Sequence, residues 1–73
     1  MKALLWNKEK HQYQHYDLPN GASAYEDYMN KKVTCASCGK KIIYGQSYTS
    51  RVIHTHMGFG YAVCKDCYIK EEK

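Results

Sequence analysis

The pattern of apolar and polar positions over the first 19 residues predicts a β-hairpin, with alternation over residues 11–16 that is typical of a half-buried strand. ALLW, residues 3–6, predicts one short strand, and NKEK, residues 7–10, predicts a polar connection. HQYQHYDL, residues 11–18, predicts the second strand of a hairpin. We expect Leu4 and Trp6 to be core residues that pack on the C-terminal half of the chain.

The segment after this hairpin predicts a turn followed by a short helix. PNG, residues 19–21, is a turn signal. Ser23 and Glu26 have the spacing of a capping box, in which each side chain accepts a backbone amide at a helix start. Apolar side chains then recur at helical spacing, at Tyr25, Tyr28 and Met29. We expect a helix over about residues 24–32, too short to be stable without packing partners.

Residues 39–63 predict two linked hairpins. Apolar IIY, residues 42–44, precedes the turn signal GQ. SYTSRVIHTHM, residues 47–57, is rich in β-branched and aromatic side chains, as strands are. GFG, residues 58–60, interrupts this run, and YAV, residues 61–63, predicts the last strand.

The composition is that of an ordinary globular chain, with 44% hydrophobic and 25% charged residues and one proline. At 73 residues, however, an apolar core alone supplies little net stability. A metal or a disulfide is usually needed at this size, and the four cysteines are the obvious candidates.

The four cysteines form two CxxC pairs with identical spacing, Cys35 with Cys38 and Cys64 with Cys67. Such pairs have three interpretations: a redox couple, a disulfide framework or a metal site. The N-terminal apolar run is too short for a signal peptide or a membrane span, so we expect a soluble cytoplasmic protein. Paired cysteines in a reducing compartment favour a metal, and one structural Zn²⁺ held by four thiolates is the prediction.

The residues beside each pair predict different local structures. Gly39 follows the first pair, where positive φ is often needed and amides donate to the sulfurs, so this pair predicts a zinc knuckle. Tyr68 follows the second pair and precedes a good helix-forming tail, IKEEK. Cys64 and Cys67 can then both face the metal from a first helical turn.

The order of knuckle, hairpin and helix resembles the treble-clef zinc fingers, and CxxCGKxI followed by YGQSY is similar to one finger of a LIM domain. It is also similar to small zinc-finger proteins encoded by bacteria and their phages. The resemblance covers residues 35–73 and leaves residues 1–34 unmatched. A complete LIM module has two zinc sites, so LIM partners are not carried over. Tyr68 argues against rubredoxins and many zinc ribbons, which have glycine after both pairs.

The formal net charge of +4 is a modest signal for nucleic acid. Four thiolates and one Zn²⁺ would lower it to about +2. Five lysines lie near the proposed ligands in sequence and can offset the thiolate charge: Lys31, Lys32, Lys40, Lys41 and Lys65. Eight tyrosines and Phe59 could stack on single-stranded nucleic acid, but tyrosines more often cover the faces of small sheets.

Four histidines raise the question of a second metal site or of catalysis. His11 pairs with His15, and His54 with His56, at strand spacing. A catalytic zinc needs an open coordination position, which four cysteines do not leave. We therefore expect surface or partly packed histidines and no enzyme activity.

The sequence predicts a single small α+β domain over residues 1–73, stabilised by a bound zinc ion. Residues 1–34 would form the N-terminal hairpin and short helix, and residues 35–73 the four-cysteine finger. The predicted function is a non-enzymatic module that binds a protein partner, such as a small regulatory or phage-encoded host-modifying protein. The alternative is a zinc-finger transcription regulator that binds nucleic acid. No membrane association is expected.

Overall fold

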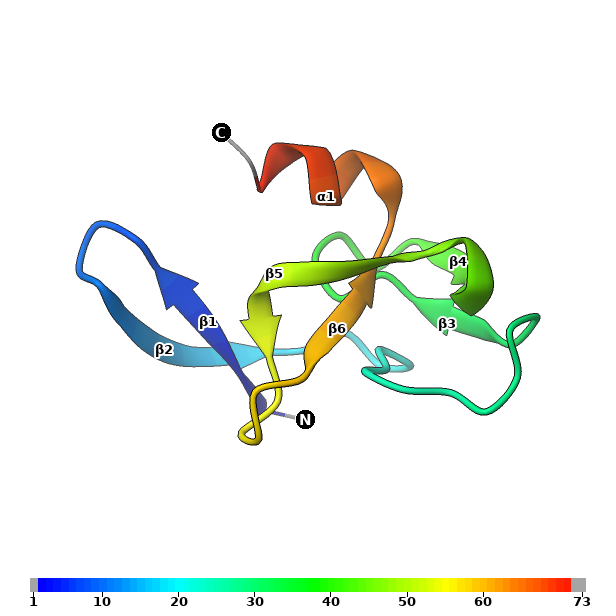
Figure 1. The fold of residues 1–73 in the computed structure, drawn as a ribbon, viewed down its shortest axis with the longest axis horizontal. Helices are drawn as coiled ribbons and strands as arrows, with labels where there is room; N and C mark the ends of the chain where they lie inside the picture. Colours follow the sequence, from blue (N-terminus) through cyan, green and yellow to red (C-terminus); the bar gives the residue numbers. More distant parts are fainter. Residues whose placement is uncertain (1, 72–73) are drawn as a thin grey trace.

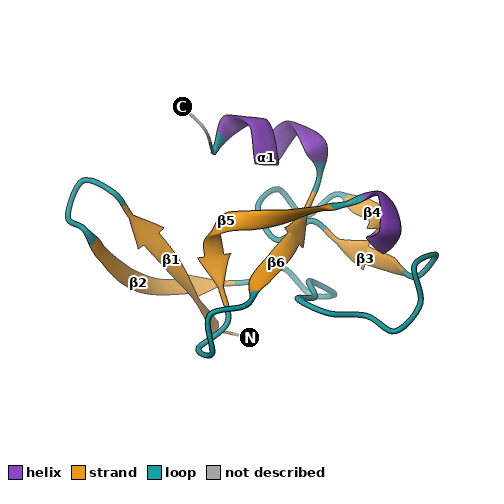
Figure 2. Cartoon of the chain, viewed as in Figure 1, coloured by secondary structure: helices purple, strands orange, loops and turns teal. Residues whose placement is uncertain are grey.

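The computed structural model describes residues 2–71 of the chain. Figure 2 shows a structure built mainly of strands, with a short helical turn beside β4 and the α-helix near the C-terminus. The elements in chain order are β1 (Lys2–Asn7), β2 (Gln12–Asp17), β3 (Lys32–Thr34), β4 (Lys41–Ile43), the 3-10 helix η1 (Tyr44–Gln46), β5 (Tyr48–His54), β6 (Gly60–Val63) and α1 (Lys65–Lys70). The molecule is therefore a small α+β structure.

The strands form two antiparallel sheets (Figure 1). The larger sheet has the order β2-β1-β5-β6, and the smaller one pairs β3 with β4. β1 joins the N-terminal hairpin to the rest of the molecule, because Leu4 lies opposite His54 and Leu5 opposite Ile53. The N-terminal hairpin is thus continuous with the sheet that leads into α1.

The predicted N-terminal hairpin is confirmed, but its buried face is not the predicted one. Ala3 is fully buried and Leu5 packs against the core. Side chains two residues apart share a face of a strand, so Leu4 and Trp6 lie on the opposite, outer face. Both are half-buried, and Trp6 packs edge-to-face on Tyr13, with ring centroids 5.1 Å apart. The prediction that Leu4 and Trp6 pack in the core was wrong.

The predicted helix over residues 24–32 is absent, and this segment forms bends and a turn. The Ser23 hydroxyl does not cap a helix; it donates to Glu26 Oε2 at 2.8 Å and lies 3.0 Å from the carbonyl of Tyr25. The side chains expected to form an apolar stripe are exposed, at 68% for Tyr25, 74% for Tyr28 and 62% for Met29. Without a buried stripe, so short a helix lacks the packing that would stabilise it.

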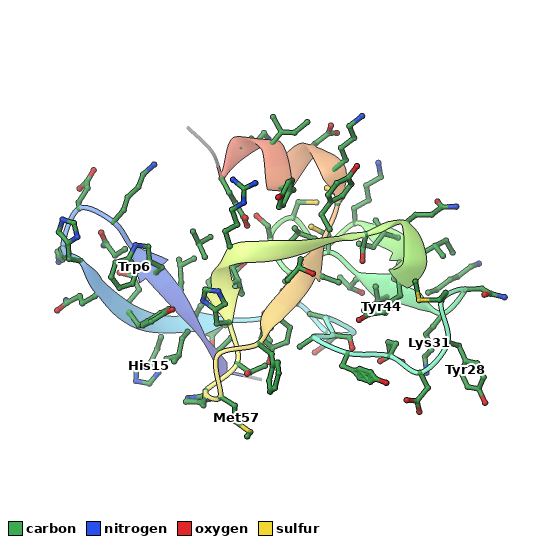
Figure 3. All side chains as sticks on the ribbon, viewed as in Figure 1. Trp6, His15, Tyr28, Lys31, Tyr44 and Met57 are labelled. Atoms are coloured by element: carbon green, nitrogen blue, oxygen red, sulfur yellow. The ribbon has the colours of Figure 1, made fainter. Side chains whose placement is uncertain are left out.

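Tertiary hydrogen bonds hold this segment and the preceding Ser23 in a non-helical loop instead. The Ser23 carbonyl accepts from the amide of Ala62 at 2.8 Å, and the Met29 carbonyl accepts from Gly45 at 2.6 Å. The Lys31 carbonyl likewise accepts from the amide of Tyr44 at 2.8 Å. These carbonyls bond to η1 and β6 rather than to amides four residues along. The loop therefore lies against the finger half, with Tyr28 and Lys31 on its outer bend in Figure 3.

The hairpins of the C-terminal half differ partly from the prediction. β5 and β6 form the predicted second hairpin. β4 pairs with the preceding strand β3, with Val33 opposite Ile42, and not with a later strand. The first hairpin therefore encloses Cys35 and Cys38 instead of following them. The predicted helix after the second pair is confirmed as α1, while Glu72 and Lys73 of the predicted helical tail, like Met1 of the predicted hairpin, lie outside the described residues.

The core lies where the larger sheet meets the β3–β4 turn and α1. Ala3, Leu18, Ile53, Tyr61 and Val63 form one buried cluster with Cys35, Ala36 and Cys67. Two of the four cysteines are therefore part of the core itself. Within residues 2–71, no helix has the length and apolar character needed to cross a bilayer.

Candidate metal centre

The fold brings all four cysteine thiols together. The Sγ atoms of Cys35, Cys38, Cys64 and Cys67 all lie within 4.8 Å of one another. Cys38 Sγ lies 3.9 Å from Cys64 Sγ, and all four cysteines are free thiols. A sulfur–sulfur separation of this size is longer than a disulfide bond. The four free thiols are therefore positioned to bind one metal ion.

The first pair lies in the tight turn that joins β3 to β4. The Cys35 amide donates to the Lys40 carbonyl at 2.7 Å, and the Gly39 amide donates to the Cys35 carbonyl at 3.0 Å. Gly39 has φ of 83°, a backbone conformation that side chains with a Cβ rarely adopt. The prediction that this glycine supplies positive φ after the second cysteine is confirmed.

The second pair lies at the start of α1. Cys64 is the N-cap residue, and Cys67 lies in the first turn. Because positions three apart share a helix face, both sulfurs point back to the β3–β4 turn. Cys35 and Cys67 are buried, Cys64 is half-buried and Cys38 is exposed. One edge of the sulfur cluster therefore faces solvent.

Backbone amides stabilise one sulfur in particular. Cys35 Sγ accepts from the amide of Cys64 at 3.3 Å and from that of Cys38 at 3.5 Å. Burial acts to raise the pKa of Cys35, but the amide hydrogen bonds outweigh it and leave that pKa at about 7. Burial raises the pKa of Cys67 to about 12, and the neighbouring sulfurs add to this effect. Repulsion between thiolates at this spacing opposes ionisation of all four sulfurs, and a cation among them would offset that repulsion.

The donor set fits a tetrahedral soft metal ion. With metal–sulfur bonds of about 2.3 Å, tetrahedral geometry places sulfurs about 3.8 Å apart. The 3.9 Å between Cys38 and Cys64 matches this value, and the remaining separations stay below 4.8 Å. Four thiolates are the ligands of structural zinc sites and of iron–sulfur sites.

Tyr16 connects the N-terminal hairpin to the metal-binding turn. Its hydroxyl donates to the carbonyl of Ala36 at 2.7 Å and lies 3.4 Å from that of Ser37, the two residues between the first pair of cysteines. Burial raises the pKa of Tyr16, and the charges of Cys35, Cys67 and Cys38 raise it further. The hydroxyl therefore stays protonated and can donate.

Glu71 fastens the end of α1 to β5. Its carboxylate accepts from the Ser50 hydroxyl at 2.6 Å and from the amide of Arg51 at 2.8 Å. The Arg51 guanidinium lies 4.6 Å from the ring centroid of Tyr68 and donates to its hydroxyl. These contacts hold the helix that carries Cys67 in place over the sheet.

The histidines do not join the sulfur cluster. His54 Nδ1 lies 3.1 Å from the Tyr13 hydroxyl on the outer face of the sheet. His11, His15 and His56 are exposed, and Figure 3 shows His15 on the hairpin strand β2. Within residues 2–71, the four cysteines form the single group of three or more metal-ligating side chains.

Sequence reasoning missed the supporting residues around the site. Tyr16, Ser50 and Glu71 carry no motif, because their contacts span 20 or more positions in the chain. Strand alternation does place Tyr16 on the same face as Gln14, but nothing in the sequence says what that face covers.

Comparisons of the chain with protein-family models, curated proteins and solved structures gave no match.

Proposed function

We propose that the protein is a non-enzymatic interaction module stabilised by one structural Zn²⁺. Cys35, Cys38, Cys64 and Cys67 would hold the ion as thiolates. The observation that supports this most directly is the convergence of four free thiols within 4.8 Å. A closed set of four protein ligands leaves no position for water or substrate, which is why the metal would be structural and not catalytic.

The zinc proposal also follows from the environment of the sulfurs. Two amides donate to Cys35 Sγ, a common arrangement around metal thiolates. The second pair opens a helix and is followed by Tyr68, unlike the two glycine-containing knuckles of an iron-binding rubredoxin. The arrangement of metal-binding turn, β5–β6 hairpin and α1 supports a treble-clef-like finger.

A binding role is supported by what the molecule exposes. Large apolar side chains are exposed on its loops, with Tyr28 at 74%, Met57 at 84% and Phe59 at 63%. Such side chains are common at protein interfaces. We propose a protein partner and a role like that of small regulatory or phage-encoded host-modifying proteins. We also propose a cytoplasmic location, which four free thiols support because such thiols persist in a reducing compartment.

Native mass spectrometry of the reduced protein tests the metal. One zinc ion per chain is expected, and its removal by a chelator should unfold the molecule, because two ligands belong to the core. Cys38→Ser should lose zinc and cooperative unfolding, whereas Lys40→Ala, an exposed neighbour in the same turn, should keep both. A metal-free protein with an unchanged melting temperature would contradict a structural role.

A further inference from the structure

The β3–β4 hairpin carries an apolar groove with two lysines beside it. Lys32, Lys41, Ile42 and Ile43 line this groove, whose volume is about 610 Å³. The register places Lys32 opposite Ile43 and Lys41 opposite Thr34, so Lys32, Lys41 and Ile43 share one face of the hairpin, while Ile42 points to the other face. Lysine stems add apolar surface to the isoleucines and carry their ammonium groups to the edge of the groove. The groove is therefore aliphatic at its base and positive at its rim.

β4 is the open edge of this hairpin. Within residues 2–71 it has no second strand beside it, whereas β3 is covered on its far side by Gly21 and Ala22. The hairpin bonds run from Tyr44 to Lys31 and from Cys35 to Lys40. In an antiparallel pair, the backbone N–H and C=O groups of every second residue bond across the pair, and those of the residues between them face away. The backbone groups of Lys41 and Ile43 therefore face away from β3. The same alternation on β3 directs the Thr34 amide to the Gly21 carbonyl, as observed.

The positive charge at the groove is available to a partner. Glu26 is paired with Lys31, Oε1 to Nζ at 3.6 Å, and not with the groove lysines. Lys41 Nζ donates to the hydroxyl of Thr34 at 3.1 Å, an uncharged acceptor that fixes its position without neutralising it. Among the described residues, neither Lys32 nor Lys41 is in an ion pair. A partner that fits must bring negative charge.

We infer that an extended acidic segment of a partner protein pairs with the open edge of β4. Its backbone would bond to the outward amide and carbonyl groups of Lys41 and Ile43. Residues two apart share a face of a strand, so one carboxylate would face Lys41 and one aliphatic side chain would face Ile43. Lys32 would lie beside the second position. This inference rests on the proposed function, because it names the surface and the chemistry of that protein partner.

A protein segment fits this groove better than nucleic acid does. Single-stranded nucleic acid is held by lysines and arginines together with aromatic rings on which bases stack. The groove supplies isoleucines and offers no ring among its lining residues. Its outward backbone groups are spaced for another polypeptide strand. Binding should weaken with salt, because two exposed lysines contribute to it.

The test is fluorescence anisotropy with a labelled peptide that contains ETVTETVT, in which a glutamate and a valine lie two positions apart. The wild-type zinc protein should bind it, and a KTVTKTVT peptide should not bind. Lys32→Glu should weaken binding at least about 10-fold through charge repulsion. Ile43→Ser should weaken it through the lost aliphatic contact. On binding, the amides of Lys41 and Ile43 should exchange more slowly with deuterium.

The matched control is Lys10→Glu, which makes the same charge change in the turn between β1 and β2, at the opposite end of the long axis (Figure 1). It should change affinity by less than about 2-fold. An equal loss in Lys10→Glu and Lys32→Glu, or no binding at low salt, would overturn the inference. So would oligothymidine binding that Lys32→Glu abolishes while the acidic peptide stays unbound. Zinc content measured on each variant separates these outcomes from a failure of the zinc proposal.

Discussion

Tyr16→Phe tests whether the N-terminal hairpin supports the metal-binding turn. The change removes one hydroxyl that donates to the Ala36 carbonyl at 2.7 Å, and Ala36 is fully buried. A net hydrogen bond contributes about 1 kcal/mol, and a buried acceptor left without a donor adds to the loss. We expect a destabilisation of about 1–2 kcal/mol. For a domain of this size that corresponds to a melting temperature lower by about 5–15 °C.

The same residue predicts a pH dependence. Burial, and then the neighbouring cysteine charges, raise the pKa of Tyr16 above its usual 10.0. A group whose pKa is raised by folding contributes stability that is present below the unfolded value and lost as pH rises through the folded one. The wild-type protein should therefore lose stability above about pH 10 more steeply than Tyr16→Phe.

Thermal and urea unfolding of the zinc-loaded proteins, followed by circular dichroism at several pH values, measures both effects. Tyr13→Phe is the control, because it removes a hydroxyl from the same strand whose partner, His54 Nδ1 at 3.1 Å, lies on the exposed outer face. It should cost less than about 0.5 kcal/mol. Equal losses in the two variants, or a Tyr16→Phe protein as stable as wild type, would refute the proposed support of the turn.

Three further predictions concern backbone geometry, the helix end and the metal. Gly21→Ala should cost about 2 kcal/mol or more in urea unfolding, because φ is +93° and a Cβ would lie 2.6 Å from Thr34 Oγ1. Gly39→Ala, with positive φ but open space, should cost less; the reverse order would contradict this. Glu71→Ala should cost about 1–2 kcal/mol, because the Ser50 hydroxyl and an amide lose their acceptor, whereas exposed Lys70→Ala should be near neutral. Acidification from about pH 7 to about pH 4 should release the metal and unfold the chain together, since protons compete for the thiolates. Metal that stays bound at about pH 4, measured by atomic absorption after desalting, would argue against thiolate ligands.

Local signals in the sequence predicted those parts of the structure that depend on near neighbours. The apolar run over residues 3–6 and the alternation over residues 11–16 predicted the N-terminal hairpin, and the β-branched run over 47–57 predicted β5. Gly39 after the first cysteine pair gave the positive φ, and the helix-forming residues after Cys64 gave α1. In each case the residues that form the element also carry the pattern, so local preference and final structure agree.

The segment over residues 24–32 shows where local reasoning fails. Its capping residues and helical spacing are real, yet so short a helix forms only if its apolar face is buried. The fold instead offers hydrogen bonds from Ala62 to Ser23, the predicted cap, and from Gly45 to Met29, and leaves Tyr25 and Met29 exposed. Nothing within nine residues could reveal partners that lie 16 and 39 positions away.

The sequence by itself determined the four candidate ligands and the local structures that present them, because CxxC spacing and neighbouring residues act over a few positions. Only the tertiary structure decided which side of the N-terminal hairpin is buried and that Tyr16 reaches the metal-binding turn. It also decided that β4 pairs with β3 and keeps an open edge beside two lysines. These features come from contacts between segments far apart in the chain, whose relative positions are fixed only when the whole core packs.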